Sequence, residues 1–572
     1  MSHQRIARRA VIIASILGVI ALINYLLFSF SSTKEPKITR VYTPPAPPSS
    51  IQLEPLQIPA LNAVLAENGR DAKEYAILEI IGTGVGCLDY DLDGRCDLYF
   101  PCGGTMDGKA QTITGKASFL LRNTGLEEAI DVTQYAGVAA EDLYSHGVIA
   151  ADLDHDGFDD MIVYGYQGVR LFMNNGDGTF ANQTAFAGLD RMPWTTSIAI
   201  FDANEDGLLD LYGACYVDWS FSKHPECEGW YLGHQEVCPP VKFSGMPDWF
   251  ALGQSNGTFE RQDSKFAPTE LGRGLGALAF RPTHENTTPE LYITNDMMNN
   301  WHFIPDEEGQ FQDDAVMLGN AVDISGNPTA SMGIALLDAN RDAAFDIFVT
   351  NFDHEYMSLY SGGVADYTCD TFTFGLHAEF PPSVAFGVVA PDLDCDGDED
   401  VFAVCGGVEY EPSIHEMEQP PVLLNNDNAE RFYRSIPNPY FESKEVGRGA
   451  VQLDWNNDGY PDVASSQLWY PPHVLLNKTP KDNNYIKIRL IGSNSPRTPI
   501  GTIVHAEAGG MKQVRQLAGG GSYLSQSQPV LFFGLGKADS AKLAIHWPDG
   551  SSQVLEEVDA NQTLTIIQQS EE

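Results

Sequence analysis

The chain has 572 residues, 43% of them apolar, which is enough for two to four domains with a large buried core. Its 78 acidic residues against 34 basic ones give a formal net charge of -44 at pH 7, which argues against binding to nucleic acid or anionic lipid, because both need a basic surface. With 10% aromatic residues, 53 Gly and 34 Pro, the composition favours β-structure with many turns.

The N-terminus contains a predicted transmembrane helix. Residues 10–30 carry no charge over a length that spans a bilayer core, and Arg5, Arg8 and Arg9 precede them. The positive-inside rule leaves residues 1–9 in the cytoplasm and the bulk of the chain outside it, periplasmic or extracellular. A cleaved signal peptide and a twin-arginine export signal are the alternatives, but the apolar run is long and no small-residue cleavage site follows it.

A proline-rich linker, residues 31–59, follows the anchor and should hold the globular part away from the membrane. Within this linker, residues 51–58 alternate like a strand. The last repeat described below ends at Asn477 and is one strand short. We expect residues 51–58 to complete that repeat, so that no sheet edge is left open.

An acidic motif, D-x-[DN]-x-D-[GA]-x-x-D followed by apolar residues, occurs six times and marks repeated units. We number the loops by unit, and positions 1, 3, 5 and 9 are the predicted metal ligands. They are Asp89, Asp91, Asp93 and Asp97 in loop 1; Asp152, Asp154, Asp156 and Asp160 in loop 2; Asp202, Asn204, Asp206 and Asp210 in loop 3; Asp338, Asn340, Asp342 and Asp346 in loop 5; Asp392, Asp394, Asp396 and Asp400 in loop 6; and Asp454, Asn456, Asp458 and Asp462 in loop 7. Such side chains in a tight loop can converge on one Ca²⁺, which prefers oxygen ligands, so we predict up to six Ca²⁺ ions as cofactors.

The loops are not EF-hands, since position 12 is never the required Glu and the flanking segments alternate like strands. Residues 146–184 contain four short strands, with the acidic loop joining the first two. A decayed unit fills the gap between loops 3 and 5, where residues 282–290 keep only Glu290. In loop 5, Ala343 replaces the glycine of position 6, which is expected to weaken that site.

Units at this spacing predict an all-β fold with a seven-bladed calcium-loop β-propeller over residues 76–478, and they favour it over a solenoid. Residues 479–569 alternate as strands with glycine-rich turns and predict a small β-sandwich or barrel. In that tail, the stretches 484–488, 519–527, 533–536 and 547–550 read NYIKI, GGGSYLSQS, FGLG and WPDG.

Together with the acidic repeats, these stretches resemble proteins that join FG-GAP or VCBS repeats, as in the integrin α-subunit propeller, to a C-terminal ASPIC/UnbV domain. This cartilage acidic protein-like resemblance covers about residues 76–569. It implies adhesion or scaffolding, and it implies no molecular activity for the ASPIC/UnbV domain.

The nine cysteines form no CxxC pair, so zinc ribbons and thioredoxin-type motifs are unsupported. Cys227 and Cys238 bracket one loop-like segment and are the candidate disulfide, with buried free thiols as the alternative. No nucleophile elbow, Walker loop or HExxH motif occurs, and the triplet from Asp353 to Glu355 is typical of a solvated surface. The sequence therefore predicts no catalytic residue.

These features predict a membrane-anchored, extracytoplasmic calcium-binding scaffold or adhesion protein that binds a protein or polysaccharide at the cell surface and does not bind nucleic acid. The alternative is a calcium-dependent carbohydrate-active enzyme resembling a propeller lyase. A pocket with converging His, Tyr, Arg and carboxylate groups would favour that enzyme. A passive part of an assembly complex is a third possibility.

Overall fold

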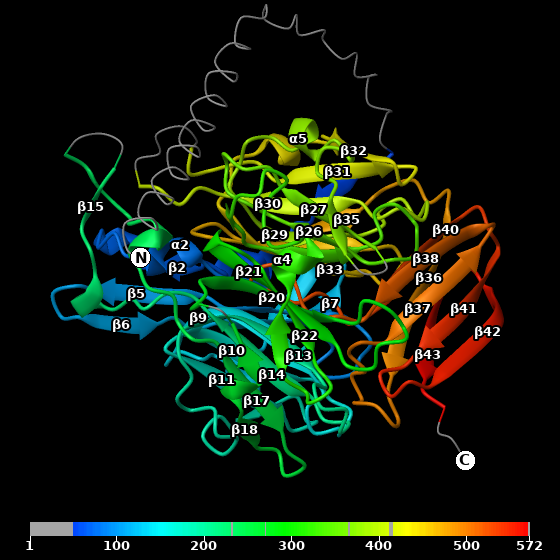
Figure 1. Ribbon diagram of the computed structural model, residues 1–572, viewed down its shortest axis with the longest axis horizontal. Helices are drawn as coiled ribbons and strands as arrows, with labels where there is room; N and C mark the ends of the chain where they lie inside the picture. Colours follow the sequence, from blue (N-terminus) through cyan, green and yellow to red (C-terminus); the bar gives the residue numbers. More distant parts are fainter. Residues whose placement is uncertain (1–49, 230–232, 269, 364–365, 411–415, 570–572) are drawn as a thin grey trace, which may run out of the picture. The chain divides into compact units, whose positions relative to one another are not determined.

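The structure is a computed structural model that describes residues 50–229, 233–268, 270–363, 366–410 and 416–569 (Figure 1). The predicted transmembrane helix, residues 10–30, and most of the linker lie outside these residues. No helix within the described ranges is long and apolar enough to cross a membrane. The described helices are short: α2 (Leu78–Ile81), α3 (Thr133–Ala136), α4 (Ala315–Leu318), α5 (Leu376–Glu379), and the 3-10 turns η1 (Pro59–Ala63), η2 (Arg70–Ala72), η3 (Phe221–Lys223), η4 (Pro240–Lys242), η5 (Asp263–Lys265) and η6 (Pro439–Glu442).

Seven sheets in the described part of the chain each contain a four-stranded antiparallel meander. In chain order, sheet 1 contains β3 (Gly86–Leu88), β4 (Asp97–Phe100), β7 (Phe119–Gly125) and β8 (Glu128–Asp131); sheet 2, β9 (Tyr144–Ala151), β10 (Asp160–Tyr166), β11 (Gly168–Asn174) and β12 (Phe180–Asn182); sheet 3, β13 (Thr195–Phe201), β14 (Asp210–Cys215), β17 (Trp249–Gly253) and β18 (Phe259–Arg261); sheet 4, β20 (Gly274–Phe280), β21 (Glu290–Met298), β22 (Trp301–Pro305) and β23 (Phe311–Asp313); sheet 5, β25 (Ile334–Leu337), β26 (Asp346–Val349), β27 (Ser358–Gly362) and β28 (Tyr367–Cys369); sheet 6, β29 (Ala385–Val389), β30 (Val401–Cys405), β31 (Val422–Asp427) and β32 (Arg431–Ser435); and sheet 7, β33 (Gly447–Leu453), β34 (Asp462–Gln467), β35 (His473–Asn477) and β1 (Leu53–Pro55).

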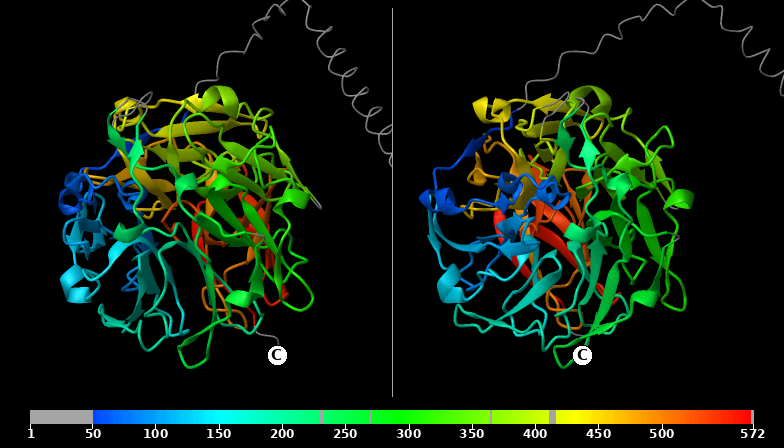
Figure 2. Two further views of the ribbon diagram at one scale, coloured as in Figure 1. Left: turned by 60° about the vertical axis from the view of Figure 1, so that its left-hand side comes forward. Right: turned by 90° about the vertical axis from the view of Figure 1, so that its left-hand side faces the viewer.

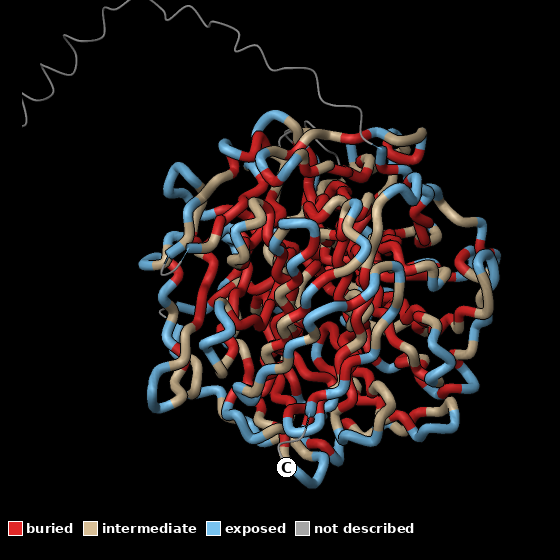
Figure 3. Tube along the Cα trace, turned by 90° about the vertical axis from the view of Figure 1, so that its right-hand side faces the viewer, coloured by how far each residue is buried: buried red, intermediate tan, exposed pale blue. Residues whose placement is uncertain are grey.

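The first strands of successive meanders form a closed cycle of contacts. β3 contacts β9, the contacts continue through β13, β20, β25, β29 and β33, and β33 contacts β3 again. Every residue of β9, β13 and β20 is buried, since apolar and small side chains on both faces of these strands pack against neighbouring sheets. Exposed residues lie mainly on the outer turns (Figure 3). The fold is therefore all-β and propeller-like.

Sheet 7 combines the start of the described chain with the last repeat. β1 pairs antiparallel with β35, with Leu53 opposite Asn477 and Pro55 opposite Leu475. The Leu56 N–H donates to Val474 O at 2.9 Å, and Leu53 is fully buried against Leu475 and its neighbours. The strand expected in residues 51–58 is β1, and it covers the outer edge of sheet 7.

Several elements are added to the seven meanders. Sheet 2 is extended by β2 (Glu67–Asn68), β5 (Gly103–Asp107) and β6 (Thr112–Gly115), and sheet 4 by β19 (Phe266–Ala267) and β24 (Thr329–Ala330). A separate hairpin, β15 (Cys227–Glu228) with β16 (Gln235–Glu236), carries a disulfide between Cys227 and Cys238, which confirms that predicted pair. The seven other cysteines, all within the described residues, are free thiols.

The C-terminal domain consists of two sheets. One is ordered β40 (Leu531–Gly536), β36 (Asn484–Ile491), β43 (Gln562–Ile567), and the other β38 (Met511–Gln516), β37 (Ile503–Ala508), β41 (Ser540–His546), β42 (Ser552–Asp559). The alternation of the sequence predicted all of these strands except β42, whose side chains are mostly exposed or half-buried.

The segment 519–528 of this domain lies inside the cycle of first strands, and we call it the plug (Figure 2). It begins with β39 (Gly519–Gly520), which pairs with β20. Its contacts reach the first strand of all seven sheets. Gln526 forms hydrogen bonds with Cys87 of sheet 1 and Ala150 of sheet 2, and Ser522 with Ile334 of sheet 5 and Ala450 of sheet 7. Gly519 pairs with Ala279 of sheet 4 and packs so closely on sheet 3 that a Cβ would lie 1.8 Å from Ile200 O, and the Tyr523 ring lies 5.0 Å from that of Phe386 of sheet 6. The C-terminal domain is therefore part of the ring's core and not a separate appendage.

Candidate metal sites

The acidic loops all connect the first strand of a sheet to its second strand. In five of the six loops, position 9 is the first residue of the second strand, and in loop 6 it immediately precedes β30. The alternating strands thus bring every copy of the motif to the same end of its sheet.

Position 1 and position 9 hold each loop in shape through backbone hydrogen bonds. In loop 2, Asp152 accepts from the Gly157 N–H at 2.8 Å, and Asp160 accepts from Leu153 at 3.0 Å and from Asn174 at 2.8 Å. The equivalent bonds recur in the five other acidic loops. Position 9 therefore ties the loop to the third strand.

Two positions of each loop have a positive φ. Position 6 is the expected glycine in five loops, and Ala343 adopts the same conformation in loop 5 with φ 66°. Position 4, which the sequence analysis did not single out, is also left-handed in all six loops, with φ between 53° in Arg341 and 65° in His155. A non-glycine residue in this region is strained, and the loop must hold it there.

Loops 1, 2 and 6 bring three carboxylates together. In each of them, positions 1, 3 and 9 offer oxygen atoms that all lie within 4.8 Å of one another. Each of these loops also contains one buried carboxylate oxygen with no hydrogen-bond partner among the described residues: Asp91 Oδ1, Asp152 Oδ1 and Asp394 Oδ1. A buried carboxylate oxygen without a donor is costly, and a hard cation with oxygen ligands would satisfy it. These donor sets fit Ca²⁺.

The predicted ligands of loops 3, 5 and 7 are arranged differently. Their position 3 is asparagine, and its amide donates to the carboxylate of position 5: Asn204 to Asp206 at 2.9 Å, Asn340 to Asp342 at 2.8 Å, and Asn456 to Asp458 at 2.8 Å. No group of three carboxylates within the same distance occurs among the described residues of these loops.

The position-5 carboxylates, in all six loops, lie outside the convergent groups. Each accepts a hydrogen bond from the backbone N–H of position 7, at 2.9 to 3.1 Å. The structure therefore brings together positions 1, 3 and 9 of three loops. Position 5 is bonded to its own turn, and in loops 1 and 7 it also pairs with Arg122 and Lys481.

Burial, with a smaller contribution from neighbouring carboxylates, raises the pKa of position 9. The pKa values of Asp97, Asp160, Asp210 and Asp346 rise to about 8. In loop 6, burial and the facing carboxylates raise the pKa of Asp396 to about 7. Burial thus favours the protonated form of these groups, and a bound divalent cation would favour their charged form.

Basic side chains of the C-terminal domain reach position 1 of three loops. Arg489 lies 3.7 Å from Asp89, Arg497 lies 3.3 Å from Asp152, and Lys487 lies 2.9 Å from Asp454. No local motif in the sequence predicts these pairs. The only hint is that basic residues recur in the tail of a strongly acidic chain.

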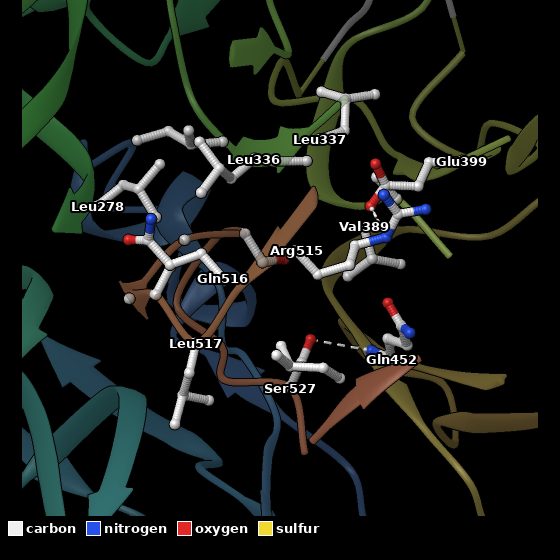
Figure 4. A pocket seen from close by; sticks show the side chains of 18 of the residues that line it. Leu278, Leu336, Leu337, Val389, Glu399, Gln452, Arg515, Gln516, Leu517 and Ser527 are labelled. Carbon is white, nitrogen blue, oxygen red and sulfur yellow. Dashed lines mark hydrogen bonds and ion pairs between the residues drawn. The ribbon is translucent and has the colours of Figure 1, made fainter. Parts of the chain in front are cut away.

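A cavity of about 170 Å³ lies between the ring and the C-terminal domain (Figure 4). Arg515 from β38 contacts Glu399 of loop 6 at 3.1 Å across it, and Glu399 also accepts the Asp338 N–H of loop 5 at 2.7 Å. The Gln452 N–H donates to Ser527 Oγ of the plug at 3.0 Å on the opposite wall. Leu278, Leu336 and Leu337 contribute apolar side chains to the wall, and Gln516 is among its further polar residues.

Loop 4 differs from its predicted form. Phe280 pairs with Glu290, so the loop begins at Arg281 and is one residue longer than the acidic loops. Arg281 takes the place of the position-1 aspartate, and its guanidinium donates to carbonyls of loop 4 and of the C-terminal domain. Glu290 lies 2.9 Å from His302 in its own sheet. A fixed arginine cation thus occupies the place of an acidic ligand set.

Among the described residues, Glu79, Arg70 and Tyr410 form a cluster of the kind expected for the enzyme alternative, with an acid, a Tyr and an Arg converging. The Tyr410 hydroxyl is bonded to Glu79, the Arg70 guanidinium lies 3.9 Å above the Tyr410 ring, and burial raises the pKa of Glu79 to about 7. In the triplet from Asp353 to Glu355, the Glu355 carboxylate has a structural role, because it accepts a hydrogen bond from the Ala330 N–H at 2.9 Å.

Two regions of the chain match known protein families. Residues 492–572 match the ASPIC and UnbV family, and residues 152–213 match an FG-GAP-like repeat. Cartilage acidic protein 1 of Xenopus tropicalis is 24% identical over 74% of this chain and 73% of its own length, and that of Homo sapiens is 22% identical over 74% and 72%.

Among solved structures, the rhamnogalacturonan lyase YesW overlaps 75% of this chain and 76% of its own at 11% identity, with a TM-score of 0.35. A superposition this loose carries no functional argument.

Proposed function

We propose that this chain, a relative of cartilage acidic protein 1 that joins an FG-GAP-like repeat to an ASPIC/UnbV region, is an extracytoplasmic calcium-binding scaffold built on a seven-bladed propeller. One observation carries the proposal: in loops 1, 2 and 6, three converging carboxylates coincide with a buried, unpartnered carboxylate oxygen. Oxygen-only donor sets of this kind suit Ca²⁺.

Calcium in this scaffold acts on stability and on shape. The unfolded chain cannot assemble the loops, so the free energy of calcium binding adds to the free energy of folding. The same loops lie against β36, β38 and β40 of the C-terminal domain, and Gly536 N–H of β40 donates to Cys395 O of loop 6 at 3.0 Å. Bound calcium would therefore also act on the contact between ring and C-terminal domain, where it would compete with Lys487, Arg489 and Arg497 for the position-1 carboxylates.

The partner surface follows from what is already covered. The C-terminal domain lies against the acidic loops and its plug fills the centre of the ring. We therefore place a protein or polysaccharide partner on the loops that join second to third strands and on the outer strands. The predicted anchor in residues 10–30 would hold this surface outside the membrane, with calcium available at extracellular concentrations.

The test is calcium binding to the full chain by calorimetry and metal analysis. Wild type should bind several Ca²⁺ ions, and Asp91→Ala, Asp154→Ala and Asp394→Ala should each remove one site. Glu128→Ala, at an exposed acid in β8 outside the loops, is the matched control. A wild-type protein without bound calcium at millimolar concentration would overturn the proposal. N-terminal sequencing of the mature protein tests the anchor, because a chain that starts near residue 32 means a cleaved signal.

The enzyme alternative rests on Glu79, Tyr410 and Arg70. A carboxyl group with a pKa near neutrality beside a tyrosine is a pair that could act in acid–base cleavage of an acidic polysaccharide. Calcium-dependent release of unsaturated sugars that is lost in Tyr410→Phe would favour this reading. Retention of calcium binding in that variant would separate it from a general loss of fold.

A further inference from the structure

Three histidines from distant parts of the chain meet between loop 4 and the C-terminal domain. His284 lies in loop 4, His505 in β37 and His546 at the end of β41. Their metal-binding nitrogen atoms all lie within 4.8 Å of one another. This is the one three-histidine group among the described residues, and it is separate from the acidic loops.

The sheet of the C-terminal domain places two of the three. In the antiparallel pair β37–β41, His505 is opposite Ala544 and His546 is opposite Ile503. The two histidines are therefore diagonal neighbours on the same face of the sheet, close enough for long or aromatic side chains to touch. Their ring centroids are 5.5 Å apart.

Loop 4 brings the third histidine onto that pair. The His284 ring lies 4.4 Å from the His546 ring and 5.7 Å from the His505 ring. Arg281 fixes the backbone on both sides, since its guanidinium donates to His284 O and Trp547 O at 2.9 Å each. The arginine that replaces the calcium ligand set thus holds the histidine group together.

The group contains unused ligand capacity. His505 Nε2 is buried and has no hydrogen-bond partner in the described part of the chain. Burial and His284 lower the pKa of His505, and burial, His284, His505 and Arg281 lower that of His546 to about 4. Neutral imidazole is the form that binds metal ions, and burial favours it in both rings.

We propose that His284, His505 and His546 bind a divalent transition-metal ion, with Zn²⁺ as the representative, and that the ion clips loop 4 to the C-terminal domain. Imidazole ligands suit Zn²⁺, Cu²⁺ and Ni²⁺ and do not suit Ca²⁺. Three protein nitrogens leave a fourth position for water or another ligand, and His284 is exposed, so the ion can enter from solvent.

The experiment is a zinc titration of the tag-free full chain with calcium in excess, so that the acidic loops do not compete for zinc. Wild type is expected to bind one zinc equivalent more than His284→Ala or His546→Ala. Zinc affinity should fall more than about 100-fold in each variant, because loss of even an outer-shell partner costs about 10- to 100-fold. Zinc should raise the melting temperature of wild type and leave that of the variants unchanged.

His377→Ala is the matched control, because His377 is an exposed histidine on α5, away from this group, and it should bind zinc like wild type. Since His284 is exposed, its alanine variant should fold normally, and equal melting temperatures without zinc would show this. Cobalt in place of zinc should give the absorption of a tetrahedral nitrogen site in wild type and His377→Ala, and not in His284→Ala or His546→Ala. Equal zinc stoichiometry and affinity in wild type and in folded His284→Ala would overturn the proposal.

Discussion

Lys487 Nζ lies 2.9 Å from Asp454 Oδ2, and the two side chains are only 5% and 0% exposed. The lysine belongs to β36 of the C-terminal domain and the aspartate is position 1 of loop 7. The Lys487 ammonium group of the C-terminal domain thus neutralises the Asp454 carboxylate of loop 7, as a bound cation would. This pair links the state of loop 7 to the docking of the C-terminal domain.

Lys487→Met should destabilise the calcium-free protein and do so less when calcium is bound. Breaking a buried ion pair by removing one partner costs about 3–5 kcal/mol, because the remaining charge is left buried and uncompensated. A calcium ion in loop 7 would compensate Asp454. Denaturant unfolding with chelator and with calcium measures the difference. Lys542→Met is the control, since Lys542 pairs with Glu556 on an exposed surface and its loss should change little. An equal loss with and without calcium would contradict the compensation.

Calcium-free protein should lose stability as the pH rises, and the calcium effect should grow over the same range. The folded-state pKa values of Asp97, Asp160, Asp210 and Asp346 are raised to about 8, above those of the unfolded chain. The stability that such a carboxyl group contributes to the folded state is fully present below its pKa in the unfolded chain, near 4. It is lost as the pH rises through the folded-state pKa, about 8. Calcium displaces these protons, so its apparent affinity should increase with pH.

Melting temperatures at about pH 5.5, 7 and 8.5, with chelator or calcium, test this linkage across the range that the raised pKa values span. A calcium-free protein that is more stable at alkaline than at acidic pH would contradict the raised pKa values. If calcium raised the melting temperature by the same amount at every pH, calcium binding would not be coupled to protonation of the position-9 carboxyl groups.

Ala343→Gly should stabilise the protein and strengthen calcium binding by loop 5. Ala343 has φ 66°, a conformation that costs a non-glycine residue about 1–2 kcal/mol. Glycine loses more conformational entropy on folding than alanine, which offsets part of the relieved strain, so we expect the free energy of unfolding to rise by about 0.5–1 kcal/mol. Ala344→Gly, one residue later and outside the left-handed region, should be neutral or destabilising. Calorimetry should show loop 5 as the weakest site in wild type, and a destabilised Ala343→Gly would refute the strain argument.

The acidic loops and most strands could be predicted because their determinants are local. Asp at fixed spacing specifies a loop, and alternating side chains specify the strands beside it, as in residues 146–184. The register of loop 4 was predicted one residue late, because the decayed motif gave no way to recognise Arg281 as position 1. The left-handed conformation at position 4 was not predicted, because none of the six residues at that position is a glycine.

The contacts of the C-terminal domain could not be predicted in this way. The glycine-rich start of the plug reads as a turn, and its partners lie as far away as Gly86, which bridges to Gln526. His284, His505 and His546 show no motif, since only the register of β37 with β41 and the path of loop 4 bring them together. The ion pairs of Lys487 and Arg497 with loops 7 and 2 likewise follow from docking and from no local pattern.

Leu53→Ala should destabilise the closure of the ring strongly. Leu53 is fully buried in β1 and packs with Leu475 and its neighbours, and loss of a buried leucine costs about 2–5 kcal/mol. Glu54→Ala is the adjacent control, because Glu54 is exposed on the other face of the same strand. Chemical unfolding of the three proteins measures the effect. Equal stability of Leu53→Ala and Glu54→Ala would show that β1 is dispensable for the ring.

Gly84→Ala and Gly519→Ala should both displace the plug. A Cβ at Gly84 would lie 1.8 Å from Leu524 O, and one at Gly519 would lie 1.8 Å from Ile200 O, so in each case a side chain would meet a backbone atom that cannot turn away. Overpacking of a core costs about 1–3 kcal/mol, and a clash with backbone should lie at the upper end. Gly125→Ala is the control, because its Cβ would meet nothing closer than 3.9 Å.

The plug contacts the first strand of every sheet, so its displacement should loosen the C-terminal domain as well as lower the melting temperature. Limited proteolysis should then cut near residue 480, between β35 and β36, in Gly84→Ala and Gly519→Ala and not in Gly125→Ala. Because Gly84 lies in the ring and Gly519 in the C-terminal domain, agreement between the two variants would assign the effect to the position of the plug, on which both contacts act. A lower melting temperature with unchanged proteolysis would mean that the ring is destabilised while the C-terminal domain remains docked.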